Sequence, residues 1–426
     1  MNHSDSERIA GFLEENGLKK ALIINQADLV IFNTCGVRQM AEDRVYGQIH
    51  NLKKSQPKIK IFLTGCLANR ADVQKRLKDK VDLFFPINKI QEIKKLFTCH
   101  SEFISEFQNQ KSILKQAEND KSYFKIKPNY SNKFTALVPI MTGCNNFCSY
   151  CVVPYARGRE VSRPKEEILK EIKDLIKKGY QEIVLLGQNV NSYKDKSNNF
   201  SKILREIDDI SGNFWINFMS NHPKDISDEF IETVTKLPKV CETIHLPIQS
   251  GSNQILKSMN RKYTTEDYLE LVSKIKKAFA KNKPRALYSL TSDIIVGFPG
   301  ETKKQFLQSA QIMRKVNYDL VYFGQFSPRP GTVAYTMKDN VSKAEKVKRE
   351  EFLNEILKKT ALENNKKYLN KKIEVLIEKE KTGFYFGRTR TGKNIKLKKD
   401  SSNLVGQIVL AKITQANIWN LEGEVI

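Results

Sequence analysis

The sequence predicts an α/β protein with three folded domains: an N-terminal α/β domain with a parallel sheet, a central partial barrel of six βα units, and a small C-terminal β-barrel. Three observations predict this organisation. Strand-like and helix-like segments alternate before residue 98, the alternation resumes at greater length from 135 to 332, and the residues after 365 show β alternation with glycine turns. Strands that alternate with helices form parallel sheets, which bind ligands at the carboxyl ends of their strands. The expected boundaries are 1–100, 101–129 for a linker or insertion, 130–364 and 365–426.

Net charge is the most unusual feature of the composition. The 426 residues include 72 Lys and Arg against 48 Asp and Glu, a formal charge of +24, which favours a nucleic-acid partner but also follows from a lysine-rich composition alone. The N-terminus has no signal-peptide core, and the chain has no apolar run of about 18 residues, so we expect a cytoplasmic protein without a membrane span. In a reducing compartment the seven cysteines are expected to be thiols or metal ligands rather than disulfides.

The N-terminal domain places a cysteine after each of its first two predicted strands. Apolar segments at 29–32 and 59–63 run into short polar turns that end in Cys35 and Cys66, and helical stretches at 37–54 and 71–80 follow. A third short strand is predicted at 81–85. Because the carboxyl ends of parallel strands meet at one edge of a sheet, both cysteines are expected there.

The central domain contains six predicted strands, too few to close an eight-unit barrel. An open or partial barrel is therefore expected, with its active site on the loops that follow the strands. The predicted strands are 136–140, 182–186, 215–219, 243–246, 287–296 and 320–326.

The most specific motif is a cysteine triplet, Cys144, Cys148 and Cys151, directly after the first of these strands. Three thiolates at spacings of four and three can occupy three irons of a [4Fe-4S] cluster and leave the fourth iron open for a ligand. Two alternatives are a structural zinc site, which needs a fourth ligand that is absent nearby, and buried structural thiols.

The triplet and its surroundings resemble the radical S-adenosylmethionine (SAM) methylthiotransferase family. Similar sequence motifs occur along nearly the whole chain, at 141–144, 151–158, 161–164, 186–193, 245–251, 293–302 and 326–332. The tail, with Gly387, Arg388, Arg390 and Gly406, resembles the RNA-binding TRAM domain. Within the family the Gly-Gln-Asn-Val-Asn-Ser-Tyr text at 187–193 is most similar to the MiaB-type tRNA enzymes.

This resemblance implies an enzyme that adds a methylthio group to carbon 2 of an isopentenylated adenosine beside the anticodon of tRNA. An aromatic C–H bond is too weakly acidic for side-chain bases, so the resemblance implies that a [4Fe-4S] cluster reduces SAM to give a radical that attacks the substrate. The second [4Fe-4S] cluster would provide sulfur, a second SAM the methyl group, and a flavodoxin or ferredoxin the electrons. The alternatives are activity on threonylcarbamoyl-adenosine in tRNA or on a ribosomal protein aspartate, and a non-catalytic, cluster-bearing RNA-binding protein.

The resemblance also assigns roles to residues. The triplet would hold the SAM cluster, and Cys35 and Cys66 would hold the second. The SAM-binding candidates lie in the triplet loop and after later strands: Tyr150, Gly187, Gln188, Asn189, Gln249, Ser250, Asp293 and Gly297. Gly187 and Gly297 could equally serve plain βα turns, and Tyr150 could stabilise its loop.

The N-terminus departs from the family pattern, which has three cysteines in the first domain. The similarity to the family pattern begins at Met1, and the first cysteine of that pattern would lie two positions before Met1. We expect a start assigned at an internal methionine, and the alternatives are a truncated gene or true loss of the ligand. If the chain begins at Met1, the second cluster is incomplete.

The tail concentrates charge, with 13 Lys and Arg against 6 Asp and Glu in residues 366–426. Arg388, Arg390, Lys393 and Lys396 are the candidates for phosphate contacts. Phe384 and Phe386 either stack on bases or fill the core of the small barrel, and the second interpretation is at least as well supported.

Overall fold

The structure is a computed structural model that describes residues 1–36, 39–94, 97, 122–399 and 403–426. Most of the predicted linker lies outside the described residues, as does Cys99, which precedes it. The described part of the linker contains the short helix α6 (Ser122–Lys125). The chain forms two compact units. The first comprises 1–131, 139–163 and 327–336, and the second 132–138, 164–326 and 337–426.

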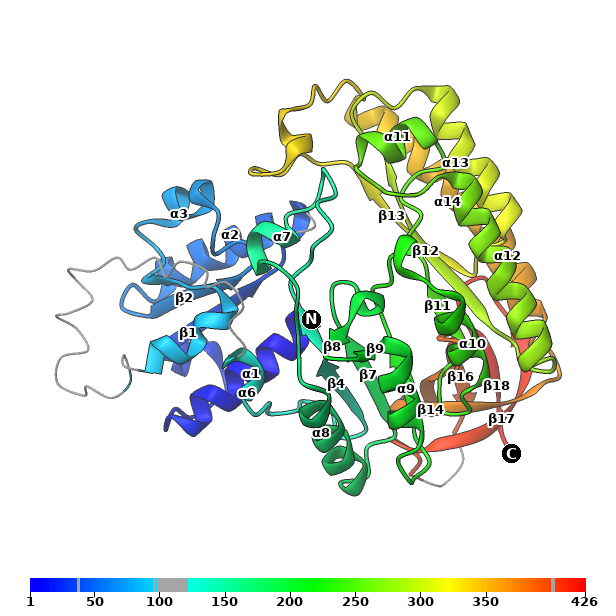
Figure 1. The fold of residues 1–426 in the computed structure, drawn as a ribbon. Helices are drawn as coiled ribbons and strands as arrows, with labels where there is room; N and C mark the ends of the chain where they lie inside the picture. The colour runs from blue at the N-terminus through cyan, green and yellow to red at the C-terminus, as the bar shows by residue number, and fades with distance from the viewer. Residues whose placement is uncertain (37–38, 95–96, 98–121, 400–402) are drawn as a thin grey trace. The chain divides into compact units, whose positions relative to one another are not determined.

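A three-stranded parallel sheet forms the centre of the first unit (Figure 1). Its order is β1 (Leu29–Thr34), β2 (Lys60–Gly65) and β3 (Leu83–Phe84). Successive residues of β2 point to opposite faces, so Phe62 packs in one buried cluster and Ile61 and Leu63 in the other. The predicted parallel α/β domain is confirmed.

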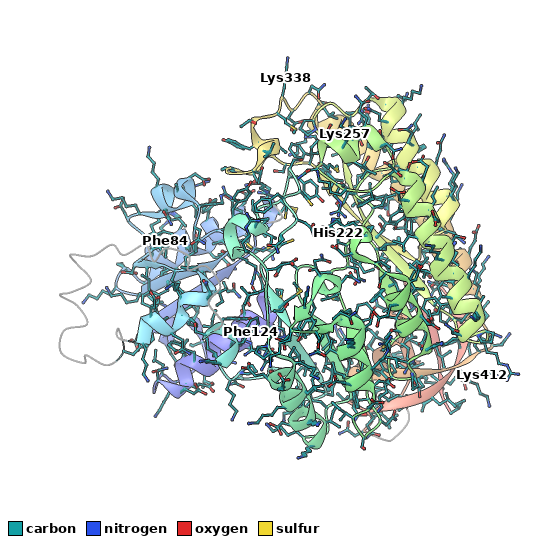
Figure 2. The ribbon with its side chains drawn as sticks, viewed as in Figure 1. Phe84, Phe124, His222, Lys257, Lys338 and Lys412 are labelled. Atoms are coloured by element: carbon teal, nitrogen blue, oxygen red, sulfur yellow. The ribbon has the colours of Figure 1, made fainter. Side chains whose placement is uncertain are left out.

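Helices supply the apolar side chains that cover this sheet. Ile9 and Phe12 of α1 (Asn2–Glu15) belong to the first cluster, together with Phe124 (Figure 2). Ile49 of α2 (Gln39–Ser55) belongs to the second, which also contains Phe84. The other elements of the unit are short: η1 (Ile24–Gln26), α3 (Ala71–Leu77), η2 (Ile87–Lys94), β5 (Met141–Thr142), α7 (Val153–Arg157), β6 (Val161–Ser162) and η5 (Val333–Thr336).

The six predicted central strands all form. They make two three-stranded parallel sheets, one of β4 (Thr135–Pro139), β7 (Glu182–Leu186) and β10 (Trp215–Phe218), the other of β11 (Thr243–His245), β12 (Ser289–Val296) and β13 (Leu320–Gln325). A parallel bridge between Ile216 and Val240 joins the two. The spatial order therefore follows the chain order, as in the predicted partial barrel.

The helices of the second unit begin at residues whose side chains cap them. Thr264 and Thr302 each form a reciprocal capping box, which pairs two otherwise unsatisfied donors at the starts of α12 and α13. The helices are α8 (Lys165–Lys177), α9 (Phe200–Asp208), α10 (Asp228–Lys236), α11 (Asn253–Ser258), α12 (Thr265–Asn282), α13 (Lys303–Val316) and α14 (Lys343–Lys366). Short elements between them are η3 (Val190–Ser192), β8 (Lys194–Asp195), β9 (Asn198–Asn199) and η4 (Pro223–Asp225).

A closed five-stranded β-barrel ends the second unit, as predicted. Its order is β14 (Lys372–Lys381), β15 (Phe384–Thr389), β16 (Asn394–Lys398), β18 (Leu421–Val425) and β17 (Ile408–Ala416). Tyr385, Leu397 and Ile413 fill its interior. A Cβ at Gly387 would lie 2.1 Å from the Leu376 carbonyl oxygen, so only glycine permits this approach of β14 to β15.

Among the described helices, none is both long and apolar enough to pass through a lipid bilayer.

Candidate functional site

The cysteine triplet occupies a compact loop between β5 and α7. The Cys144 amide donates to the Gly158 carbonyl (3.1 Å), and the Cys151 amide to that of Cys148 (3.0 Å). Gly143 has φ +76°, and a Cβ there would lie 2.0 Å from the Arg159 carbonyl oxygen. A glycine before the first cysteine is therefore required for the loop to close.

The triplet thiols are largely shielded from water. Cys144 and Cys148 are buried, and Cys151 is half-buried. The pKa of Cys144 is raised to about 11 and that of Cys151 to about 12, mainly by burial, and the charge of Cys148 contributes to both shifts. Neighbouring thiols whose charges interact are suitable ligands for a group that displaces their protons.

The described residues contain no set of three His, Cys, Asp or Glu side chains arranged around a single metal ion. In a [4Fe-4S] cluster each thiolate binds a different iron, so the sulfurs need not surround one ion. The three coupled thiols on one closed loop therefore fit a cluster rather than a single ion.

Cys35 and Cys66 lie at matching positions on neighbouring strands. Thr34 of β1 pairs with Gly65 of β2, and each cysteine is the next residue. The Cys66 amide donates to the Thr34 carbonyl at 2.9 Å. The predicted placement of both thiols at the carboxyl edge of the sheet is confirmed.

This sheet edge contacts the triplet loop. A Cβ on Gly36 would lie 3.0 Å from Cβ of Cys66 and 3.5 Å from Cγ2 of Val152, the residue after Cys151. Cys66 is also close enough to Cys151 for its charge to raise the pKa of that thiol. The two sets of cysteines therefore lie side by side within the first unit.

Arg157 lies beside Cys66. Its Nη2 is 2.5 Å from Oδ2 of fully buried Asp5, whereas its buried Nη1 has no hydrogen-bond partner among the described residues. Burial alone would lower the pKa of Arg157, but the charges of Asp5 and Cys66 outweigh burial and raise it. A buried guanidinium with an unused donor beside a thiol fits an anionic group ligated there. The motif text includes Arg157, but sequence reasoning gave it no role.

A pocket of about 280 Å³ opens beside Cys66. Its wall includes Tyr155 of α7 and Arg70, whose Nη1 is 2.7 Å from Oε2 of Glu42. Glu42 also accepts from Arg329 at 3.4 Å. The pocket lining is Cys66, Asn69, Arg70, Ala71, Asp72, Val152, Tyr155, Ala156, Pro330 and Gly331.

Amide side chains gather after β7 and β10 in the second unit. The predicted Gln188 and Asn189 are joined there by Asn191 and Asn221, which the sequence analysis missed. Gln188 Oε1, Asn189 Oδ1, Asn191 Nδ2 and Asn221 Oδ1 are all buried without a hydrogen-bond partner among the described residues. Because buried polar atoms are normally paired, this group fits a polar ligand such as SAM. The asparagines at 189 and 191 mark one of these loops in the sequence, but no sequence signal pairs it with the loop of Asn221.

Two residues in this region have strained backbones. Ser220 has φ +73° and Gln249 φ +72°, both in the left-handed region that favours glycine. Gln249 is held there because its amide donates to the Asp293 carbonyl and its own carbonyl accepts from Ile295, both at 2.9 Å. Such strain concentrates at ligand sites, and Ser250, fully buried, follows directly.

Asp293 of β12 and His245 of β11 form a polar pair, with Oδ2 3.3 Å from Nε2. The other ring nitrogen of His245 is 2.9 Å from Thr291 Oγ1. The Asp293 side chain is 37% exposed, so it keeps access to a ligand.

His222, labelled in Figure 2, is a buried neutral histidine. Burial, then the charges of Arg261 and Lys224, lower its pKa to about 2. Its Nδ1 accepts from the Lys224 amide at 3.3 Å, and its own amide donates to Asn191 at 3.2 Å. His222 therefore anchors the loop that carries Asn221.

Of the remaining SAM-binding candidates, Gly297 has a packing role. It has φ +68°, and a Cβ there would lie 2.4 Å from Cγ of Lys346 on α14. Gly187 is buried directly after β7, and Tyr150 is half-buried in the triplet loop of the first unit. Their contact with SAM stays a prediction.

Three of the four predicted RNA-binding cations pair with carboxylates of the central domain. Arg388 Nη2 is 2.9 Å from Glu182, and Lys393 Nζ is 2.6 Å from Asp319. Arg390 binds Glu242 through two nitrogens, at 2.8 and 3.0 Å. The acceptors stand at the amino ends of β7, β13 and β11 respectively. These cations therefore dock the barrel at the ends of the strands opposite the loops that carry Gln188, Asn221 and Gln249.

Comparison with known proteins identifies the parts of the chain. Residues 138–313 match the radical SAM superfamily, 1–86 match an uncharacterized protein family designated UPF0004, and 366–426 match the TRAM domain. Members of the radical SAM superfamily bind SAM and a [4Fe-4S] cluster. A radical SAM methyltransferase, TsrM from Kitasatospora setae, shares the fold with a TM-score of 0.50 at 13% identity, over 77% of this chain and 66% of that one.

Curated relatives align over the whole chain. Proteins from Thermoanaerobacter pseudethanolicus and Clostridium botulinum are each 42% identical over 100% of this chain and 90% and 95% of their own lengths. A Finegoldia magna protein is 41% identical over 100% of this chain and 92% of its own. All three are named tRNA-2-methylthio-N(6)-dimethylallyladenosine synthase. At this identity and coverage, the chain belongs to the family of tRNA-2-methylthio-N(6)-dimethylallyladenosine synthases.

Proposed function

We propose that this protein converts N6-isopentenyladenosine next to the tRNA anticodon to its 2-methylthio derivative. The observation that carries the proposal is the contact between the Cys66 turn and the triplet loop. Insertion of sulfur needs the sulfur source close to where the substrate is activated, and the two sets of thiols occupy one compact unit. The names of the relatives support the same substrate.

Each set of residues has a defined task. Cys144, Cys148 and Cys151 would hold one [4Fe-4S] cluster, and Cys35 and Cys66 would hold irons of a second. When bound, the first cluster and SAM supply radical chemistry strong enough to remove hydrogen from an aromatic carbon, and the second cluster supplies sulfur. The buried amides after β7 and β10, with Asp293, bind the polar parts of SAM.

The protein also controls the environment of the thiols. Burial of the triplet excludes water, and Arg157 places positive charge beside Cys66. Asp5 holds that guanidinium in place through the 2.5 Å contact between its carboxylate and Nη2 of Arg157. A flavodoxin or ferredoxin would donate electrons, and a second SAM would supply the methyl group. A cytoplasmic location follows from a tRNA substrate.

The proposal is tested with reconstituted protein, SAM, a reductant and tRNA that contains isopentenyladenosine. We expect 5′-deoxyadenosine, S-adenosylhomocysteine and 2-methylthio-N6-isopentenyladenosine by mass spectrometry of the reaction and of digested tRNA. In this product the carbon-bound hydrogen would have left in 5′-deoxyadenosine, the sulfur would come from the second cluster and the methyl group from the second SAM.

Two variants separate the roles of the cysteine sets. Cys144→Ala should abolish both 5′-deoxyadenosine and the modified nucleoside. Cys66→Ala should retain 5′-deoxyadenosine but lose methylthiolation, whereas Cys241→Ala, a buried cysteine of the core, should retain both. Absence of 5′-deoxyadenosine from the wild type would refute an enzymatic role. Modification of threonylcarbamoyl-adenosine or of a ribosomal protein instead would refute the substrate.

A further inference from the structure

Strand β15 exposes two aromatic rings on the outside of the C-terminal barrel. Its residues alternate in burial, so Tyr385 is fully buried in the barrel core while Phe384 and Phe386 on the other face are partly exposed. The expectation that these two phenylalanines fill the core is therefore wrong. The interior ring belongs to Tyr385 between them.

Lysines flank each exposed ring on both sides. Phe384 stands between Lys381 of β14 and Lys398 of β16 in the antiparallel register. Phe386 stands two residues on, between Lys379 and Lys396. Directly opposed residues of antiparallel strands share a face. The barrel thus presents two successive Lys–Phe–Lys rows, here called the Lys–Phe face.

The lysines of this face are little used within the protein. Lys379, Lys381 and Lys398 are exposed and form no ion pair within the part of the chain that the structure describes. Lys396 Nζ is 4.0 Å from Glu422 and 3.9 Å from the Phe384 ring centroid. Lys379 Nζ is 5.7 Å from the Phe386 centroid. By contrast, Arg388 on the same strand pairs with Glu182.

We propose that the Lys–Phe face binds unstacked nucleotides of the tRNA, with bases on Phe384 and Phe386 and phosphates on the four lysines. Consecutive rows are about 6.8 Å apart, two residues of an antiparallel strand, so each ring can take a different base. Aromatic rings stack on bases of any sequence, and lysines beside them neutralise the backbone. The inference rests on the proposed function, which supplies tRNA as the partner.

Charge complementarity selects RNA over an apolar partner. The two rings are bordered by four cations, a composition that favours a polyanion. The ammonium groups now near the rings can turn to phosphates because exposed cation–π contacts are weak compared with base stacking.

The test measures binding of fluorescent tRNA to the full chain by anisotropy over a range of salt concentrations. The Phe384→Leu/Phe386→Leu variant retains apolar volume but loses the rings, and we expect about ten-fold weaker binding with an unchanged salt slope. The Lys381→Gln/Lys398→Gln variant should lower the slope of log K against log salt by about 1.4, since each lost single-strand contact removes about 0.7.

Two further variants control for charge and folding. Lys372→Gln/Lys412→Gln removes the same charge from an opposed lysine pair on β14 and β17, and binding should stay within about two-fold of wild type. The Phe384→Tyr/Phe386→Tyr variant keeps both rings, so its affinity for tRNA should match that of wild type. This result would show that the leucine variant binds weakly because it lacks the rings.

The outcomes distinguish this inference from the proposed function. Wild-type protein that does not bind tRNA would refute both. Binding by wild type and equal binding by all variants would refute the Lys–Phe face alone. A changed salt slope without any effect of the leucine substitutions would refute base stacking.

Discussion

Arg390 in the turn after β15 and Glu242 before β11 form a two-point ion pair, with Nε 2.8 Å from Oε2 and Nη2 3.0 Å from Oε1. Their side chains are 17% and 9% exposed. Arg390 also donates to the carbonyl oxygens of Pro238 and Val240. Desolvation of both ions offsets much of their attraction, so the pair determines where the barrel docks more than how stable it is.

Removing one partner of this pair should be costly. Glu242→Gln leaves Arg390 and Lys283 buried without their carboxylate, and we expect a loss of about 2–4 kcal/mol in the free energy of unfolding. Urea denaturation measures it. The matched control is Glu374→Gln, because Glu374 is 3.6 Å from Arg390 but 44% exposed; its loss should stay below about 1 kcal/mol. Equal losses would show that the barrel does not depend on this contact.

His222 should make stability depend on pH. Its folded pKa of about 2 lies below the unfolded value of about 6.5, so the unfolded state binds the proton first and acid destabilises the fold. The contribution is complete above about pH 6.5 and falls by about 1.4 kcal/mol per pH unit below it. His222→Asn should remove this slope between pH 6.5 and 5, as measured by denaturation at several pH values. The same slope in the variant would contradict neutral burial.

Arg157 should tune the reduction potential of the cluster that we propose Cys66 helps to hold. Arg157→Gln removes a positive charge beside this thiol, which makes addition of an electron less favourable, so the reduction potential of that cluster should become more negative. Potentiometric titration and iron content provide readouts that do not depend on turnover. Arg159→Gln is the control, since Arg159 is exposed and lies over the Phe147 ring at 4.5 Å. An unchanged reduction potential with retained iron would show that Arg157 does not act on this cluster.

Alanine substitutions at Gly297 and Gly300 distinguish the stability cost of steric crowding from that of backbone strain. Both have positive φ, +68° and +82°, but only Gly297 is crowded, by Lys346 of α14. Gly300→Ala should cost about 1–2 kcal/mol for the left-handed backbone alone. Gly297→Ala should cost about 1–3 kcal/mol more, because Lys346 must move. Equal losses in the free energy of unfolding, measured by chemical denaturation, would mean that Lys346 of α14 moves aside at no cost.

The sequence was most informative where local pattern determines position. Parallel strands with short polar turns predict that Cys35 and Cys66 share a sheet edge, and Thr34 indeed pairs with Gly65. The cysteine spacing predicts a single closed loop, which the Cys144–Gly158 hydrogen bond confirms. In these cases the relevant neighbours lie close in sequence or follow from strand alternation.

Long-range partners could not be predicted in this way. The charge of Arg388 is visible in the sequence, but its acceptor Glu182 is 206 residues away. Alternation at 384–386 shows that one set of aromatics faces inward, yet three consecutive rings do not reveal which set. Packing decided it by placing Tyr385 inside. The gathering of Asn191 with Asn221 likewise depends on two loops that meet only in the folded chain.

The docking of the barrel on Glu182, Glu242 and Asp319 sets a minimum length for any RNA that reaches both the barrel and the loops that we propose to bind SAM. These acidic residues stand at the amino ends of strands, whereas Gln188, Gln249 and Asn221 follow the carboxyl ends. The eight residues of β12 extend about 26 Å. A free nucleoside cannot bridge that depth, so only a longer RNA can contact the barrel and these loops at the same time.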